Sequence, residues 1–498
     1  MTHEHTGIKR RTRVAAARER LHERLRPHDR TEQVPLREAV GRALATDVTA
    51  SRAVPQTDRA AVDGWAVRAS DTVGASPRAP AVLRVARDGD GAETDGTDTT
   101  DTHAETPTVS PEAAVPVDTG EPLPAGADAV VRVEVTTRVG DELEVARAVP
   151  ERGDVVVRGE DVTGGQQLYR AGHRLRAGDL GLLRAVGREQ VTVAERPRVA
   201  VFPTGDELVG RDPDPGETLE TNGVVVERLT AAWGGDATVE PAVPDEPAAL
   251  RARLSTAARG LDTSETVDDA ADGPAGADTP TDADVIVTVG GTAVGGRDHL
   301  PSVVAELSEG DENATERDER AEPDDPADEP FVRGVAAEPG HPTTLGVVGD
   351  TPVVCLPGYP VACVVAAVQF LRPAVHRLAG GHTPPHPTTE AELTRKVASG
   401  PGVRTFAPVR LGDDGTDTHR SDTVGTDGAD DTDTAHDTNV TGATPTDGGT
   451  SARSTLGLAD GWVVVPESRE GYDTGETVTV ELWERPAAGP ADTVGGPA

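Results

Sequence analysis

The chain has 498 residues, enough for several domains, and its formal net charge is -38 at pH 7. Lys9 and Lys396 are its only lysines, so arginine carries nearly all of the positive charge. Such a surface repels nucleic acid and anionic membranes, which excludes both as partners. It also repels itself unless salt screens the charges, so we expect a salt-rich cytoplasm, as in a halophilic archaeon. An acidic disordered protein would explain only parts of the chain.

Two features of the sequence predict a cytoplasmic location. Residues 1–11 lack the apolar core of a signal peptide, and no run approaches the length of a membrane span. Cys355 and Cys363 are the only cysteines, and they lie close together in an apolar segment. We interpret them as buried small hydrophobic residues in a reducing compartment, not as a disulfide or a metal site.

The first 190 residues alternate short helical and extended segments. Helices are predicted over 14–25, at the start of 35–50 and over 179–186, and strands over 81–86 and up to 149. Asp63-Gly64 is a turn signal, and Asp128 lies where a second turn ends.

From residue 198 onward, strands and helices alternate, which predicts a parallel, doubly wound sheet. The predicted strands begin at 198 and cover 237–243, 285–289, 332–337, 345–348 and 352–356. The predicted helices cover 222–235, with Asn222 as a candidate cap, 245–259, and 360–378. A proline-rich linker then leads to a small β-domain over 391–484.

The predicted fold is a multidomain α/β protein. A helical and extended N-terminal domain combines 8–50 with 150–190, and a small β-rich domain is inserted between these two parts at 51–149. A central doubly wound α/β domain spans 195–382. A C-terminal β-domain spans 388–486. Acidic polar tracts interrupt these domains at 89–110, 263–282, 308–330 and 413–450. They lack core-forming residues, so we expect disordered insertions.

The stretch around residues 284–300 is the strongest candidate for a ligand site. The β-branched run Val285–Val289 is typical of a strand buried on both faces, and Gly290-Gly291 then allow a tight turn with exposed backbone N–H groups. A helix is predicted from Pro301. Strand, turn and helix would place a ligand at the carboxyl end of a parallel sheet. A glycine pair alone is equally typical of a plain β–α turn, and the loop matches neither GxGxxG nor the Walker motif.

Five motifs, in order along the chain, resemble the MoeA and gephyrin E-domain family of molybdopterin molybdenumtransferases. They are DRAAVDGWAV (58–67), LPAGADAVV (123–131), PTGDELV (203–209), GGTAVGGRDH (290–299) and LPGYPVA (356–362). The resemblance implies a molybdopterin-binding central domain and insertion of molybdate into adenylylated molybdopterin with release of AMP. It also implies Mg²⁺ as a cofactor, an elongated homodimer, and a molybdopterin adenylyltransferase as a candidate partner. In such dimers, the small domain of one subunit faces the sheet domain of the other.

The resemblance also implies which residues form the site. The expected catalytic carboxylates are Asp63, Asp128, Glu207 and Asp298, of which Glu207 and Asp298 would hold the metal. The expected substrate-binding residues are Thr204, Gly205, Asp206, Glu220, Gly290, Gly291, Thr292, Arg297, Pro339, Gly340, His341, Pro357 and Gly358. Carboxylates can hold a hard cation that bridges to phosphate and oxo groups, or move protons, while backbone N–H groups of the glycine turns contact anions. Arg297 and Arg333 are candidate phosphate partners. Taken singly, each acid is equally interpreted as a solvated surface group or a turn former.

The chain departs from the family pattern at several positions. Glu338 and His341 replace two lysines in a segment usually read KPGKP, and Glu220 stands where the family has Asp. Ala60-Ala61-Val62 replaces Ser-Ala-Met, Ala293 replaces Ser, and Tyr359 gives GYP for GNP. A Lys-to-Glu change reverses charge. Glu338 and His341 therefore leave open a non-catalytic molybdopterin-binding scaffold. A tungstate-preferring paralogue also stays open, because the motifs cannot separate two oxyanions of nearly equal size and charge.

Overall fold

The computed structural model describes residues 11–86, 108–258, 283–292, 299–308, 331–412, 441–446, 449 and 451–484. Most of the four tracts predicted to be disordered lies outside these ranges. The chain forms two compact units: Glu32–Val193 is one, and Met1–Thr31 with Ala194–Ala498 is the other. We call them the insert unit and the sheet unit. The finer division into four domains stays a prediction.

The sheet unit is built around a six-stranded sheet with the order β16-β13-β17-β21-β20-β18. Its strands are β13 (Arg198–Pro203), β16 (Asp236–Val239), β17 (Val285–Val289), β18 (Val332–Arg333), β20 (Thr344–Val348) and β21 (Thr351–Leu356). The four strands from β16 to β21 are parallel, while β20 and β18 continue the sheet antiparallel. The predicted parallel sheet is thus confirmed for its central part, with an antiparallel hairpin added at one edge.

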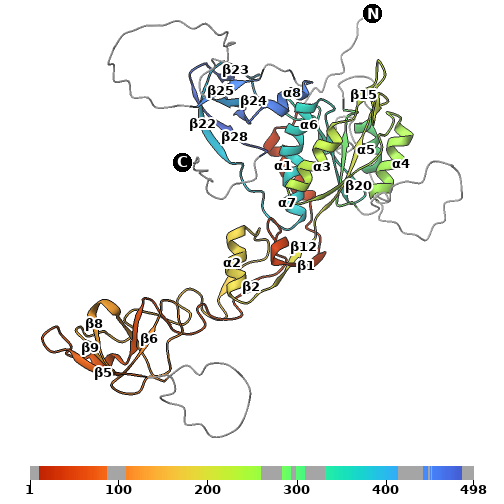
Figure 1. Ribbon diagram of the computed structural model, residues 1–498. Helices are drawn as coiled ribbons and strands as arrows, with labels where there is room; N and C mark the ends of the chain where they lie inside the picture. Colours follow the sequence, from red (N-terminus) through yellow and green to blue (C-terminus); the bar gives the residue numbers. More distant parts are fainter. Residues whose placement is uncertain are drawn as a thin grey trace, which may run out of the picture. The chain divides into compact units, whose positions relative to one another are not determined.

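Helices cover both faces of this sheet, as a doubly wound fold requires (Figure 1). On one face lie α1 (Val14–Arg24), α3 (Asn222–Ala232), α6 (Pro360–Ala366) and α7 (Arg372–Leu378); on the other lie α4 (Pro247–Ala258) and α5 (Leu300–Ser308). Val285, Val287 and Val289 belong to the first core, and Ile286 belongs to the second. This alternation explains why all of β17 is buried, as its apolar run predicts.

The predicted helix over 360–378 forms, but it is not amphipathic. Every residue of α6 is buried, and a π-helical segment (Ala367–Leu371) joins α6 to α7. The buried Gln369 in that segment accepts a hydrogen bond from Arg18 Nε through its carbonyl oxygen. Among the described residues, Pro360–Leu378 is also long and apolar enough to cross a membrane by length and composition, so the expectation of no such run was wrong. Because 89% of its most apolar window is buried inside the protein, it serves as a core helix.

A second six-stranded sheet forms the C-terminal part of the sheet unit, with the order β19-β24-β25-β22-β28-β26. Its strands are β19 (Ala337–Glu338), β22 (Thr388–Leu393), β24 (Arg404–Gly412), β25 (Gly442–Pro445), β26 (Gly461–Val465) and β28 (Thr477–Glu481). β25 lies inside the tract predicted to be disordered over 413–450, so that boundary was wrong. The reason is Ala443, a small apolar residue that is fully buried between its strand neighbours.

The insert unit contains its own six-stranded sheet, with the order β7-β4-β6-β5-β9-β8. Its strands are β4 (Gly64–Val67), β5 (Ala81–Val85), β6 (Ala113–Val117), β7 (Ala129–Arg132), β8 (Thr136–Val139) and β9 (Glu142–Val145). The helix predicted over 179–186 is confirmed as α2 (Ala177–Ala185). Val109 is buried, so the tract predicted over 89–110 is too long at its end.

The prediction of a helix at the start of 35–50 was wrong. β1 (Thr31–Pro35) pairs with β12 (Gln190–Ala194), and only the single turn Leu36–Glu38 is helical. Gly41 has φ +77°, which ends any helix there. Tertiary pairing with a distant strand overrides local helix propensity at this point.

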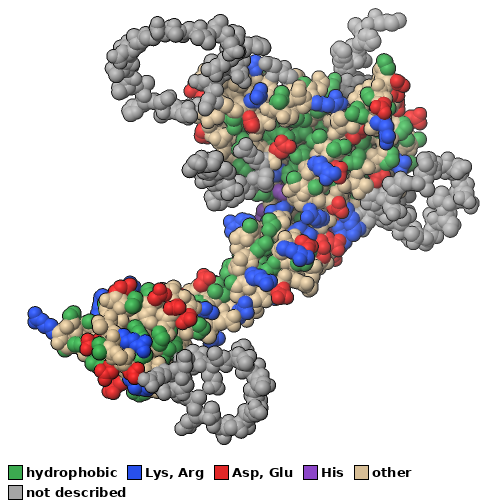
Figure 2. Space-filling model, in the orientation of Figure 1, with side chains coloured by type: hydrophobic (Ala, Val, Ile, Leu, Met, Phe, Trp, Pro, Cys, Tyr) green, Lys and Arg blue, Asp and Glu red, His purple; other side chains and the backbone are tan. Residues whose placement is uncertain are grey.

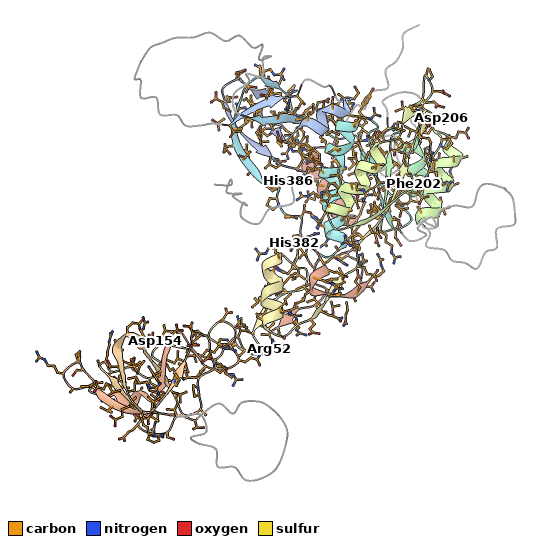
Figure 3. All side chains as sticks on the ribbon, viewed as in Figure 1. Arg52, Asp154, Phe202, Asp206, His382 and His386 are labelled. Carbon is orange, nitrogen blue, oxygen red and sulfur yellow. The ribbon has the colours of Figure 1, made fainter. Side chains whose placement is uncertain are left out.

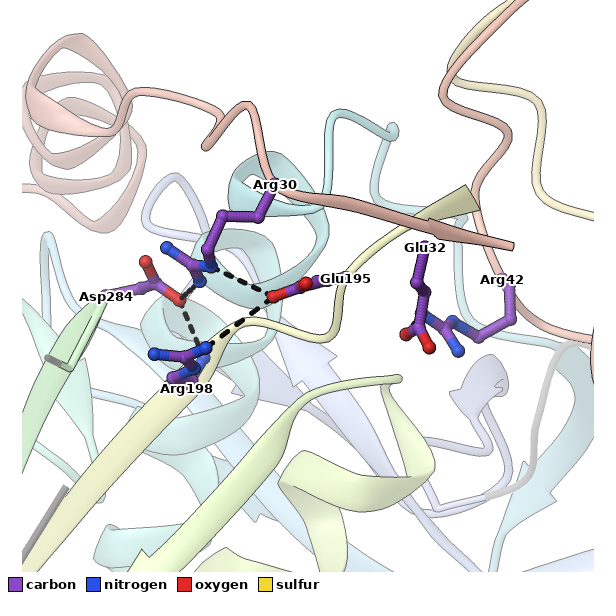
Figure 4. A network of polar contacts seen from close by, with 6 residues as sticks. All are labelled: Arg30, Glu32, Arg42, Glu195, Arg198 and Asp284. Carbon is purple, nitrogen blue, oxygen red and sulfur yellow. Dashed lines mark hydrogen bonds and ion pairs between the residues drawn. The ribbon is translucent and has the colours of Figure 1, made fainter. Parts of the chain in front are cut away.

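An ion-pair network in the sheet unit lies next to the two points where the chain enters and leaves the insert unit (Figure 4). Arg30 Nε lies 3.1 Å from Glu195, and Arg30 Nη2 lies 2.5 Å from Asp284. Arg198 contacts Glu195 at 3.6 Å, and its backbone N–H donates to Asp284 at 2.8 Å. Because all four residues are partly buried, these pairs fix the starts of β13 and β17 more firmly than surface pairs would.

The two cysteines lie in the core of the sheet unit. Both are buried free thiols, as predicted. Burial raises the pKa of Cys363, so its thiol stays protonated and unreactive.

Candidate active site at the carboxyl edge of the central sheet

A cleft of about 970 Å³ opens in the sheet unit where the parallel strands end. The loops that follow β13, β17 and β21 line it, together with the segment after β19. Backbone hydrogen bonds hold the loops to one another: Thr204 N–H donates to Val289, and Gly290 N–H donates to Leu356. The structure therefore places a ligand-sized cleft at the edge that the strand order predicts.

The glycines of the β17 turn are required by close contacts. Gly290 has φ +105°, and a Cβ there would lie 2.4 Å from the Thr204 carbonyl oxygen. Gly291 has φ +64°, and a Cβ there would lie 3.0 Å from Thr204 Oγ1. On the far side, a Cβ at Gly358 would lie 3.4 Å from the Gly290 Cα. The three glycines thus let bare backbone come together along the floor of the cleft.

The PTGDEL segment brings carboxylates to the same edge. Phe202 is buried within β13, and Asp206 lies beyond the end of that strand (Figure 3). Glu207 lines the cleft, and its carboxylate lies against Gly205, where a Cβ would be 2.7 Å from Oε2. Gly205, at φ +148°, therefore makes room for the Glu207 side chain and is not itself among the lining residues. Asp206 does not line the cleft either, and accepts a hydrogen bond from the Asp245 N–H at 3.2 Å.

Asp245 is a site residue that the sequence analysis missed. It follows β16 and lines the cleft. Burial raises its pKa, and the nearby Glu207 and Asp206 carboxylates raise it further. Its position just after a strand of the parallel sheet was the available signal, because the carboxyl ends of such strands meet at one edge. Asp245 thus lies near enough to Glu207 and Asp206 for their negative charges to act on it.

Glu220 and Asn222 hold the start of α3 against the cleft. Glu220 accepts a hydrogen bond from the Gly223 N–H at 2.6 Å, which caps the helix. Asn222 was predicted to be the cap, but it is the first helical residue, and its side chain donates to the Gly358 carbonyl at 2.7 Å. That bond ties the α3 start to the loop after β21. Both residues line the cleft.

The EPGHP segment forms another wall of the cleft. All five residues of the segment line the cleft: Glu338, Pro339, Gly340, His341 and Pro342. His341 Nδ1 lies 3.7 Å from the Glu338 carboxylate, and the nearby His341 lowers the pKa of Glu338. The two residues that depart from the family lysines thus pair with each other.

Most predicted substrate-binding residues meet in this cleft. Lining residues include Thr204, Glu220, Gly290, Gly291, Thr292, Pro339, Gly340, His341, Pro357 and Gly358. Arg297 and Asp298 lie outside the described residues. Arg333, on the edge strand β18, does not line the cleft. Arg453, Ser451 and Tyr359 do line it and were not predicted as binding residues.

Asp63 and Asp128 belong to the insert unit, where each supports a turn. Asp63 Oδ1 accepts hydrogen bonds from the Thr119 N–H at 2.7 Å and from the Thr119 hydroxyl at 2.6 Å. These bonds lower the pKa of Asp63. Asp128 Oδ1 accepts from the Ala69 N–H at 2.6 Å. Both acids therefore have a structural role within their own unit.

The donor set at the carboxyl edge suits a hard divalent cation. Glu207 and Asp245 offer carboxylate oxygens, and a cation between them would relieve the repulsion that raises the Asp245 pKa. Within the described ranges, no group of three or more His, Cys, Asp or Glu residues could enclose a metal ion. Mg²⁺ needs no such cage, because it usually takes one or two protein carboxylates, water and substrate phosphate.

Comparisons with known proteins agree over most of the chain. Family models match at residues 12–187 (MoeA N-terminal region, domains I and II), 263–377 (probable molybdopterin binding domain) and 434–483 (MoeA C-terminal region, domain IV). Molybdopterin molybdenumtransferase 2 of Mycobacterium tuberculosis is 33% identical over 376 residues, covering 75% of this chain and 81% of its own length. The Bacillus subtilis molybdopterin molybdenumtransferase is 28% identical over 461 residues, covering 91% and 90%.

A solved structure shares the fold. The molybdopterin biosynthesis MoeA protein of Pyrococcus horikoshii superposes with a TM-score of 0.67 at 28% identity, covering 96% of this chain and all of that one. The multidomain α/β architecture predicted from the sequence is thereby confirmed. The chain belongs to the MoeA family of molybdopterin molybdenumtransferases and is a transferase of molybdenum cofactor biosynthesis.

Proposed function

We propose that the protein inserts molybdate into adenylylated molybdopterin and releases AMP, in the cytoplasm of a cell with high internal salt. The observation that carries this proposal is the cleft itself, which joins glycine-turn backbone to a carboxylate cluster at one sheet edge. Backbone N–H groups can contact phosphate and oxo groups, and the carboxylates can act on a bound cation or on protons. The carboxylates alone would repel an anionic substrate, so they need the N–H groups or a cation beside them.

Within the cleft we assign different tasks to the two kinds of group. The Gly291 and Thr292 backbone and the Thr204 and Thr292 hydroxyls bind and orient the pterin phosphate, because the N–H groups of Thr204 and Gly290 already donate to Val289 and Leu356. Glu207 and Asp245 would hold Mg²⁺, together with Asp298, which lies outside the described residues. Bound there, Mg²⁺ would supply positive charge that offsets the negative charge of the substrate. Glu207 is exposed to solvent at the rim, so it can also exchange a proton during the transfer.

We further propose that the protein acts as a homodimer with sites shared between subunits. Asp63 and Asp128 lie on the insert unit, whereas Glu207 lies on the sheet unit. In the arrangement that the family resemblance implies, the insert unit of one subunit would bring Asp63 and Asp128 to the cleft of its partner. A molybdopterin adenylyltransferase would supply the substrate.

AMP release from adenylylated molybdopterin tests the proposal, measured with molybdate, with tungstate and without an oxyanion. We expect release that depends on molybdate. Faster release with tungstate would identify a tungstate-preferring paralogue instead. Binding of the pterin without release under any condition would favour a scaffold, the alternative that Glu338 and His341 suggest.

A further inference from the structure

We propose that Arg453, in the C-terminal part of the sheet unit, binds the anionic portion of the substrate, a phosphate or a tetrahedral oxyanion. In this chain it would supply the fixed positive charge that the family lysines at positions 338 and 341 would otherwise give. The proposal rests on the proposed function, because it requires an anionic substrate in the cleft.

The charges that line the cleft leave few candidates for holding an anion. The acidic lining residues are Glu207, Glu220, Asp245 and Glu338. Among the described lining residues, the cationic side chains are His341 and Arg453. An anion entering this cleft therefore needs either a bound cation or one of these two side chains to offset the carboxylates.

His341 is the weaker of the two candidates. Its Nδ1 lies 3.7 Å from the Glu338 carboxylate, so the charge that it carries when protonated is largely offset by its neighbour. Histidine also carries its charge only at the acidic end of the physiological range. An arginine side chain, by contrast, is a positively charged donor throughout the physiological range. In the described part of the chain, no carboxylate forms an ion pair with it.

The contacts of Arg453 orient its guanidinium. It is the first residue of α8 (Arg453–Leu458), which packs against α6. Its Nε donates a 2.9 Å hydrogen bond to the Thr221 hydroxyl, and Thr221 precedes α3 and also lines the cleft. With Nε held in this way, Nη1 and Nη2 remain as a pair of donors. Such a fork matches two oxygens of a phosphate or oxyanion.

The test is calorimetric binding of two probes, AMP and molybdate, to the full-length protein at one fixed salt concentration. We expect Arg453→Gln to weaken binding of at least one probe by about tenfold or more, because a charge-assisted pair of hydrogen bonds is lost. Arg453→Lys should give an intermediate loss, since lysine keeps the charge but not the fork. Arg410→Gln is the matched control: it removes the same charge from an exposed position on β24 that does not line the cleft.

The pattern of losses identifies the ligand group. A loss confined to AMP assigns Arg453 to the phosphate, and a loss confined to molybdate assigns it to the oxyanion. If Arg453→Gln binds every probe that the wild type binds, and binds each equally well, the role of Arg453 is refuted while the proposed function stands. If the wild type binds neither probe, both proposals are refuted. Thermal melting of Arg453→Gln checks that this exposed substitution leaves the fold intact.

Discussion

The motif carboxylates of the two units have opposite surroundings. In the insert unit, Asp63 and Asp128 accept short hydrogen bonds from backbone N–H groups, and these bonds lower the Asp63 pKa. In the sheet unit, Glu207 and Asp245 approach each other at the cleft, where burial and mutual repulsion raise the Asp245 pKa. The fold thus lowers the pKa of Asp63 in the insert unit and raises that of Asp245 in the sheet unit.

This difference separates two roles that look alike in the sequence. A carboxylate that fixes a turn is satisfied within its own unit. Carboxylates that repel one another at a cleft hold an unfavourable charge that a cation or a proton would relieve, and perturbed groups of this kind gather at functional sites. In the proposed dimer, the partner subunit would present Asp63 and Asp128 to the cleft.

A mixed-dimer experiment tests whether the carboxylates of the two units act together in one shared site. Asp63→Ala and Asp298→Ala homodimers should each be nearly inactive in AMP release, because every site lacks one acid. Co-refolding the two variants should restore roughly a quarter of wild-type activity: half of randomly paired dimers are mixed, and each has one intact site of two. If mixed dimers form and the mixture stays as inactive as its parents, both acids act within one chain.

Salt should act on both units alike, because the acid excess is not confined to the cleft. Figure 2 shows acidic side chains on the surface of each unit. The Debye length falls from about 10 Å at 0.1 M salt to about 3 Å at 1 M, so repulsion between surface carboxylates should weaken. We expect the melting temperature to rise by about 5 °C or more across that range. A melting temperature that stays constant between 0.1 M and 1 M salt would contradict the prediction of a salt-rich cytoplasm.

A smaller effect is expected from Asp245→Asn. The folded-state pKa of Asp245 lies above its ordinary value, so the favourable contribution of its protonated form is lost as the pH rises through that pKa. Without divalent cations, Asp245→Asn should therefore raise the melting temperature at pH 7, by about 1 to 3 °C, and leave it unchanged near pH 3.

Asp350→Asn serves as the control for this prediction. Asp350 is exposed in the turn between β20 and β21, and it does not line the cleft. Its substitution should leave the melting temperature unchanged at both pH values. Equal stabilisation by the two variants would mean that Asp245 experiences only the general charge of the chain.

The sequence predicts the central fold well, and the cleft only in part. The β-branched run at Val285–Val289 and the glycines after it have one physical interpretation, a buried strand and a tight turn, and both are found. The helix at the start of 35–50 fails because residues of that segment form β-bridges with distant parts of the chain, Ala43 with Arg174 and Leu44 with Val193.

Arg453 and Asp245 were missed for the same reason: each meets its neighbours in the cleft through contacts between distant parts of the sequence. Arg453 meets Thr221 across 232 positions of the sequence. Asp245 meets Glu207 and Asp206 only because β16 and β13 are adjacent in the sheet. No local pattern marks Arg453, and the signal for Asp245 was only its position after a strand of the parallel sheet.

The most direct test of the central claim is single-turnover AMP release by Glu207→Gln, with binding of adenylylated molybdopterin measured in parallel. If the cleft carboxylates carry the chemistry, release should fall by about 100-fold or more, while binding stays within about threefold of wild type. Glu470→Gln, an exposed change outside the cleft, should behave as wild type. Near-normal release by Glu207→Gln would contradict the account and move the chemistry away from this residue.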